Sequence, residues 1–119
     1  MRPHESLDVW KKAVDFVVAT YKVTEAFPKD ERFGLTSQLR RAAVSIAANI
    51  AEGAGRKSPK EFVHFLSNSQ GSASEVDTEL LIARRLRYIQ EDNYLILAAS
   101  LDEIGRMLTG LCRHLGKRF

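Results

Sequence analysis

The chain has 119 residues, of which 45% are apolar and 28% are charged, with three prolines, one cysteine and a formal net charge of +3. This length is enough for one domain (residues 1–119) with a sizeable core, and the composition excludes a disordered or fibrous protein. No apolar run approaches the roughly 18 residues that cross a bilayer, and the N-terminus lacks a signal-peptide pattern. We therefore expect a cytoplasmic protein without a membrane span or an internal disulfide.

Basic residues are concentrated in the first half of the chain. Residues 1–60 hold 11 Lys and Arg against 7 Asp and Glu, whereas residues 61–119 hold 7 against 8. A solvated helix face carries such an excess, and so does a surface that attracts nucleic acid. The charge distribution leaves both interpretations open.

The first helix is predicted over about residues 7–26. Ser6 or Asp8 is placed to cap its start, and Phe27-Pro28 ends it because proline disfavours helix in the residue before it. Apolar residues at helical spacing predict a core stripe, which consists of Leu7, Trp10, Val14, Val17 and Tyr21.

The second helix is predicted over about residues 36–53, with Thr36 or Ser37 as its cap. One face has the spacing of a bundle core and contains Leu39, Ala42, Ala43, Ile46, Ile50 and Gly53. A further arc is also apolar and contains Val44, Ala47, Ala48 and Ala51. This apolar surface is wider than one core contact needs, so the pattern predicts a second apolar contact for this helix.

The third helix is predicted over about residues 59–88. Ser58-Pro59-Lys60-Glu61 is a capping box with proline at the first helical position. The predicted core face contains Phe62, Phe65, Leu66, Ser69, Ala73, Val76, Leu80 and Ala83. Because glycine inside a helix is unfavourable, Gly71 predicts the close approach of another backbone or a bulky side chain, with the second helix as the natural partner.

The fourth helix is predicted over about residues 91–115. It has the most regular heptad pattern in the chain, which consists of Tyr94, Leu97, Leu101, Ile104, Leu108, Leu111 and Leu115. Ser100 to Glu103 also matches a capping box, but a helix start there would break the heptads, so we interpret the match as false. Short connections between four helices predict an all-α, antiparallel up-down-up-down four-helix bundle.

No residue pattern indicates catalysis or a metal. The serines lack a nucleophile-elbow pattern, and the three histidines, His4, His64 and His114, lie on different segments. Cys112 and His114 are two residues apart, a spacing that points them in different directions on a helix. We therefore expect no catalytic residues, no metal and no cofactor.

Charged and polar side chains on the second and third helices form a candidate lattice. Glu75 and Glu79 repel each other slightly at i, i+4. Either basic groups on the second helix, Arg41 and Arg56, compensate them, or the two carboxylates form an acidic site. The complete set, a register-setting lattice or a binding site, is Arg41, Ser45, Asn49, Glu52, Arg56, Glu75 and Glu79.

A separate basic cluster lies at the start of the third helix. Arg56, Lys57 and Lys60 lie at a helix N-terminus, where free N–H groups and positive potential suit phosphate. The glycines of GAGRK do not form a P-loop, because GxxxxGK[ST] is absent. Two further basic groups are Arg84, Arg85 and Arg87, and Lys117 with Arg118.

Four segments carry a resemblance to a known family: LDVWKKA, YKVTEAFPKDERFGLTSQLRRAAVSIAANIAEGAGR, SPKEFVHFL and GSASEVDTEL. Over about Leu7 to Ile89, the chain resembles the four-helix bundle family of proteins encoded in intervening sequences of bacterial 23S ribosomal RNA genes. Gln38 to Arg56 is the most specific part, although Ala47 stands where the family often has proline. The resemblance implies an antiparallel four-helix bundle that assembles into a homopentameric ring.

That family is similar to accessory proteins of diversity-generating retroelements, which are basic pentamers that bind nucleic acid and a reverse transcriptase. The expected function is accordingly a non-enzymatic, self-assembling helical-bundle scaffold that binds RNA or another nucleic acid. One alternative is a small-molecule-binding or enzymatic bundle with a polar site between the second and third helices. The other is a protein–protein adaptor.

Overall fold

The computed structural model describes residues 1–118. In chain order it contains the short 3-10 helix η1 (Pro3–Ser6), α1 (Asp8–Thr24), the 3-10 helix η2 (Lys29–Glu31), α2 (Leu35–Ala54), α3 (Pro59–Arg85) and α4 (Glu91–Gly116). No strand occurs in this range. The predicted all-α class with four helices is confirmed.

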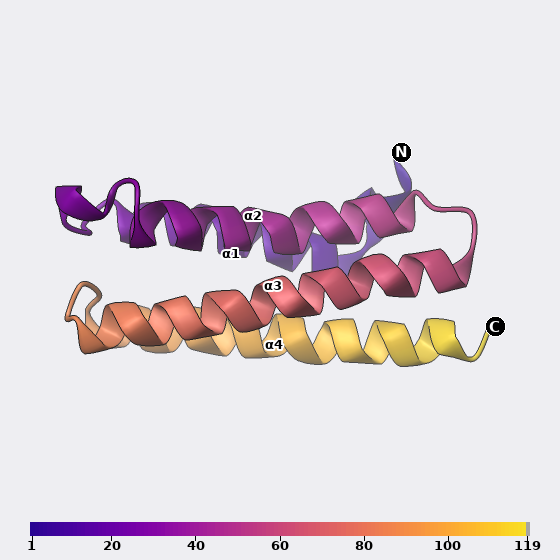
Figure 1. Cartoon of the computed structure of the whole chain (residues 1–119). Helices are drawn as coiled ribbons and strands as arrows, with labels where there is room; N and C mark the ends of the chain where they lie inside the picture. The colour runs from indigo at the N-terminus through magenta and orange to yellow at the C-terminus, as the bar shows by residue number, and fades with distance from the viewer. Residues whose placement is uncertain (119) are drawn as a thin grey trace.

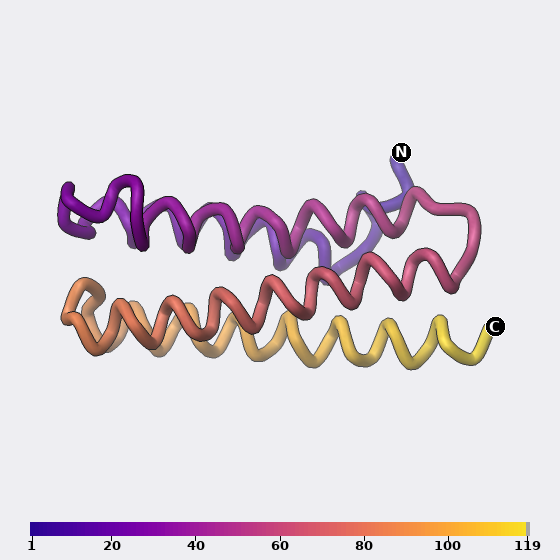
Figure 2. The backbone as a smooth tube through the Cα atoms, in the orientation of Figure 1, coloured from indigo at the N-terminus to yellow at the C-terminus, as the bar shows by residue number. Residues whose placement is uncertain are grey.

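The four helices form a rod that measures 46 × 21 × 21 Å. Each helix contacts two neighbours, in the pairs α1–α2, α2–α3, α3–α4 and α1–α4. Figure 1 shows successive helices running in opposite directions. The backbone trace in Figure 2 places both ends of the chain toward the end of the rod that carries the α2–α3 connection. The α1–α2 and α3–α4 connections lie at the other end.

The core is built from the faces that periodicity predicts on α2 and α4. All six predicted core positions of α2 are buried, and Leu39, Ile46 and Ile50 are fully enclosed. On α4, the buried residues are Leu97, Leu101, Ile104, Leu108 and Leu115, and the uninterrupted helix confirms that the capping-box match at Ser100 is false. No helix of the described chain is long and apolar enough to cross a membrane.

The core stripe predicted for α1 is rotated about the helix axis from the face that is actually buried. The buried residues are Val9, Ala13, Phe16, Thr20 and Thr24, whereas Tyr21 is 41% exposed. The two threonines tolerate burial because their hydroxyls donate to carbonyls one turn earlier, Thr20 to Phe16 and Thr24 to Thr20, both at 2.8 Å. The larger apolar residues of the predicted stripe flank the core, and Leu7, Trp10, Val14 and Val17 are partly buried against it.

The starts of the first two helices differ from prediction. Leu7 is the N-cap residue of α1 and makes no side-chain cap, so neither Ser6 nor Asp8 occupies that position. Gly34 precedes α2, and the Glu31 carboxylate accepts the N–H of Leu35 at 3.1 Å in place of a cap from Thr36 or Ser37. At α3 the prediction is confirmed: the Ser58 hydroxyl accepts the N–H of Glu61 at 3.1 Å.

α3 ends at Arg85, three residues before the predicted end. Arg87 adopts a left-handed backbone with φ 63°. The N–H of Tyr88 then donates to the carbonyl of Ala83 at 2.9 Å, and that of Arg87 donates to Arg84 at 3.0 Å. These two bonds are those of a Schellman motif, which closes a helix.

The close helix contact predicted at Gly71 lies elsewhere. A Cβ atom at Gly71 would meet no atom within 4 Å, so the glycine does not mark a contact within the chain. At Gly53, by contrast, a Cβ would lie 2.9 Å from both Phe62 Cδ1 and Phe65 Cβ. The tight approach of α2 to α3 therefore occurs at the C-terminal end of α2.

Candidate functional site

Part of the predicted lattice joins α2 to α3. The Asn49 amide donates to the Ser45 carbonyl at 2.9 Å and to its hydroxyl at 3.0 Å, and the Ser72 hydroxyl donates to the Ser45 hydroxyl at 2.8 Å. Beside these bonds, the Ser69 hydroxyl donates to the carbonyl of Ile46 at 2.8 Å. These contacts fix the two helices against each other at mid-length.

The charged members of the lattice do not pair between helices. Arg56, two residues beyond the end of α2, forms an ion pair with Glu52 of that helix. Within residues 1–118, no carboxylate lies within 4.0 Å of Arg41, and no basic group lies that close to Glu75 or Glu79. Arg41 and Arg56 therefore form no ion pair with Glu75 or Glu79, so the predicted direct compensation of this acidic pair is absent from the described residues.

Glu79 is buried, which the sequence reasoning missed. Only 6% of the residue is exposed, and its Oε1 atom is enclosed without a hydrogen-bond partner. Burial raises the pKa of the Glu79 carboxyl, and the charge of Glu75 raises this pKa further. The signal was available, because Glu79 falls at helical spacing between the core residues Val76 and Ala83.

The basic cluster at the start of α3 is partly neutralised. Arg56 pairs with Glu52, and its guanidinium lies 4.6 Å from the centre of the Phe65 ring. Lys57 and Lys60 are exposed and take part in no ion pair of the described chain. This end of the rod therefore presents two lysine charges to solvent at a capped helix start.

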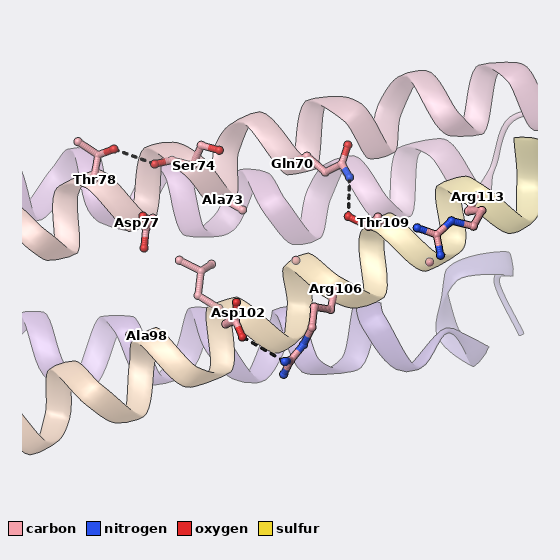
Figure 3. Close-up of a pocket in the computed structure, with 13 residues that line it drawn as sticks. Gln70, Ala73, Ser74, Asp77, Thr78, Ala98, Asp102, Arg106, Thr109 and Arg113 are labelled. Atoms are coloured by element: carbon pink, nitrogen blue, oxygen red, sulfur yellow. Dashed lines mark hydrogen bonds and ion pairs between the residues drawn. The ribbon is translucent and has the colours of Figure 1, made fainter.

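A groove of about 800 Å³ lies between α3 and α4. In Figure 3, Gln70 of α3 and Thr109 of α4 point toward each other, joined by a hydrogen bond of 3.4 Å. Asp102 and Arg106 form an ion pair of 3.4 Å along α4. Charges of both signs and many small residues line this groove, so it has no preference for one sign of ligand.

A second pocket, of about 500 Å³, is basic and aromatic. It lies where α1 and the α1–α2 connection meet the first half of α2. Its lining, which we name the arginine pocket, consists of Tyr21, Arg32, Phe33, Thr36, Ser37, Arg40, Arg41 and Val44. Of these residues, sequence reasoning assigned a functional role to Arg41 alone. The others come from three segments whose meeting the sequence pattern does not reveal.

Apart from Arg41, the polar residues of the enzymatic alternative lie outside the three pockets described. A third cavity, of about 250 Å³, lies between α1 and α4 beside the ion pair of Lys12 with Glu103. None of the three pockets is lined by Asn49, Glu52 or Glu75. The described residues hold no group of three His, Cys, Asp or Glu side chains arranged for a metal.

Cys112 is the one thiol of the chain, and it is half-buried on α4. Burial raises the pKa of the Cys112 thiol, which disfavours the nucleophilic thiolate. Two features with unpaired basic groups lie at opposite ends of the rod: the exposed lysines at the start of α3 and the arginine pocket.

Comparisons with known proteins identify relatives of this four-helix chain. A family model described as 23S rRNA-intervening sequence protein matches residues 5–110. The chain is also similar to a crystal structure from Bacteroides thetaiotaomicron, a protein of unknown function from the S23 ribosomal protein family. That likeness has a TM-score of 0.79 and 26% identity, and it covers 87% of this chain and 97% of the other. The comparison with curated proteins gave no match.

Proposed function

Because the chain belongs to the 23S rRNA-intervening sequence protein family, we propose that it is a non-enzymatic, self-assembling helical-bundle scaffold that binds RNA in the cytoplasm. The proposal joins two properties, assembly through apolar surface and attraction of phosphate. Each is supported by a different part of the rod.

The observation that carries the assembly is the distribution of exposed large apolar side chains. Apart from Met1, they lie from the middle of the rod to the end with the α1–α2 and α3–α4 connections. Those that we propose for the contact between copies are Val18, Val44, Leu81, Ile82, Leu86, Leu95 and Ile96, whereas Tyr21 and Phe33, which are also exposed, line the arginine pocket. Exposed apolar side chains that are concentrated in one half of a rod favour a protein interface there. On α2, Val44 and Ala48 of the predicted second apolar contact are exposed in the single chain.

We propose that the partner is a second copy of this chain and that the assembly is a homopentameric ring of up-down-up-down subunits. The stoichiometry comes from the family resemblance. Five copies have a formal charge of about +15, which attracts phosphate at low salt. Lys57 and Lys60 are the exposed charges that we propose for the phosphate backbone, with Arg56 beside them.

The test is the mass of the native assembly, measured with and without single-stranded RNA. We expect an oligomer in both samples and a heavier species with RNA, whose affinity falls steeply between low and physiological salt because phosphate contacts release counterions. The double variant Lys57→Glu, Lys60→Glu should bind RNA more weakly than the matched variant Lys11→Glu, Lys22→Glu, which reverses two exposed charges on α1. The proposal would be contradicted by RNA binding that changes neither with salt concentration nor in the double variant Lys57→Glu, Lys60→Glu.

A protein–protein adaptor is the outcome that a monomeric mass would favour. In that case the exposed apolar residues outside the arginine pocket, with Ile96 at 64% exposure, would be left for a different protein.

A further inference from the structure

We propose that the arginine pocket binds a nucleotide, with the phosphate against the guanidinium groups of Arg40 and Arg41 and the base stacked on Phe33. The inference rests on the proposed function and deepens it, because it locates a second contact with the strand, far from Lys57 and Lys60. The pocket volume of about 500 Å³ lies within the range of about 300–1,000 Å³ that is usual for small-molecule sites.

The first argument is uncompensated charge. Arg32, Arg40 and Arg41 line the pocket, and no acidic residue does. Arg56, Arg84 and Arg106 each have a carboxylate within 4.0 Å, whereas the three pocket arginines have none among residues 1–118. Other arginines, such as Arg113, are also unpaired, but the pocket brings three unpaired arginines into one concavity. A guanidinium offers planar, paired N–H donors that match phosphate oxygens. The pocket therefore concentrates donors for an anion in one concave place.

Glu31, which lies next to Arg32 in the chain, is engaged elsewhere. Glu31 precedes the pocket in the chain but does not line it. Its carboxylate accepts the N–H of Leu35 at 3.1 Å and the hydroxyl of Tyr88 at 3.0 Å. The carboxylate is thus held by α2 and Tyr88, and it does not neutralise the arginines.

The second argument is preorganisation of Arg40. Its Nε donates to the buried Thr24 hydroxyl at 2.8 Å, and its Nη2 donates to the Tyr21 carbonyl at 3.2 Å. The guanidinium also lies 4.5 Å from the centre of the Tyr21 ring. All of these partners are neutral, so the full positive charge is held in place for a ligand. A donor that is already ordered loses less entropy on binding.

The third argument is the aromatic platform. Phe33 is 88% exposed, although a phenylalanine gains free energy from burial. The Arg32 guanidinium lies 5.4 Å from the centre of its ring. Exposed aromatic rings beside arginines are typical of sites where nucleic acid bases stack, at about 1–3 kcal/mol per base. One nucleotide therefore matches both features of the pocket, its phosphate the arginines and its base the ring.

The experiment titrates the full chain with three probes at constant ionic strength: uridine monophosphate, inorganic phosphate and a single-stranded ten-nucleotide uridine RNA. The test variants are Arg41→Gln and Phe33→Leu, both at exposed positions where the fold tolerates change. We expect about tenfold weaker binding of the RNA for each. Arg113→Gln is the matched control, because it removes one exposed arginine charge from the α3–α4 groove, and it should change the affinity less than twofold.

The outcomes separate the two sources of the ligand and the two proposals. Weaker binding of uridine monophosphate in the variants supports a free nucleotide as ligand, and weaker binding of the RNA alone supports a nucleotide within a strand. Inorganic phosphate should respond to Arg41→Gln but not to Phe33→Leu. If RNA binding is unchanged in both pocket variants yet falls in Lys57→Glu, Lys60→Glu, the pocket inference is overturned and the proposed function stands.

If no RNA binds to the unmodified chain, the proposed function fails as well. If Phe33→Leu changes the native mass while neither pocket variant changes RNA binding, the pocket residues serve a contact between copies, and the nucleotide inference is overturned.

Discussion

Glu79 is a buried acidic residue with an unpartnered oxygen, and the four-helix fold does not require a charge at this position. A carboxylate that is 94% buried with an unpartnered oxygen destabilises the folded state when it is charged. Glu79→Gln keeps the shape and removes the charge. We expect it to stabilise the protein at neutral pH by about 1–3 kcal/mol, measured by urea unfolding.

The pH dependence of this effect gives an independent check. The pKa of Glu79 is raised in the folded state, so the folded chain binds a proton more readily than the unfolded one. The unmodified protein should therefore lose stability relative to Glu79→Gln as pH rises from the unfolded pKa of about 4.3 through the folded pKa. At pH 4 the two proteins should differ least. The exposed neighbour substitution Glu75→Gln should have a smaller effect, and an equal effect would contradict burial as the main cause.

At this scale, sequence pattern predicts hydrophobic positions better than polar ones. Glu79, Thr20 and Thr24 are buried, yet their chemistry suggests exposure. The threonine hydroxyls satisfy their hydrogen-bonding capacity within α1, by donating to carbonyls four residues earlier, so burial leaves them with a partner. For Glu79 the residue type suggests exposure, whereas its helical spacing between Val76 and Ala83 indicates the buried face.

At the scale of the helices, the contact of α2 with α3 depends on one glycine. Gly53→Ala places a methyl group 3.1 Å from the Phe62 carbonyl oxygen and closer still to two ring or Cβ carbons. Overpacking of this kind costs about 1–3 kcal/mol, which exceeds the gain in helix propensity. We expect a lower midpoint of thermal unfolding.

Gly71→Ala on α3 is the matched substitution, because the space around it is open. It should stabilise the protein by about 0.5–1 kcal/mol through helix propensity. A destabilising Gly71→Ala would contradict this assignment of the two glycines.

The end of α3 provides a third test. Arg87 holds a left-handed backbone that costs a non-glycine residue about 1 kcal/mol. Arg87→Gly should therefore raise the free energy of unfolding by about 0.5–1 kcal/mol. Arg85→Gly, two residues earlier in the last turn of the helix, should lower it by a similar amount. Changes of the same sign in both variants would be inconsistent with the Schellman motif.

The helices themselves were predictable because their apolar residues repeat at helical spacing over long segments. The predicted limits agree with the structure within about three residues, and Ser58 caps α3 as predicted. The cap of α2 was not predictable, because the acceptor is Glu31, four residues before Leu35 and within a different element. The arginine pocket was missed for the same reason: its residues converge only after α1 and α2 pack together.

At the scale of the whole molecule, the two ends of the rod differ in chemistry. The end with the α2–α3 connection presents Lys57 and Lys60, and the opposite end presents apolar side chains and the arginine pocket. Such a rod can associate with other copies through the apolar side chains of one end. The lysines at one end and the arginine pocket at the other then remain available to phosphate. Figure 1 shows that the α3–α4 connection, beside which Leu86, Leu95 and Ile96 lie, is at the apolar end.

The assembly itself is tested by placing a charge in that apolar end. Ile96 is 64% exposed on the first turns of α4, so Ile96→Asp leaves the subunit core intact. If copies associate through this surface, the buried aspartate would be desolvated without a partner, and the native mass measured by light scattering should fall toward that of the 13.4 kDa chain. Asn68→Asp changes an exposed residue in the first half of α3, toward the α2–α3 connection and away from the apolar end. This variant should leave the mass unchanged. Equal masses for both variants would place the contact between copies on a different surface.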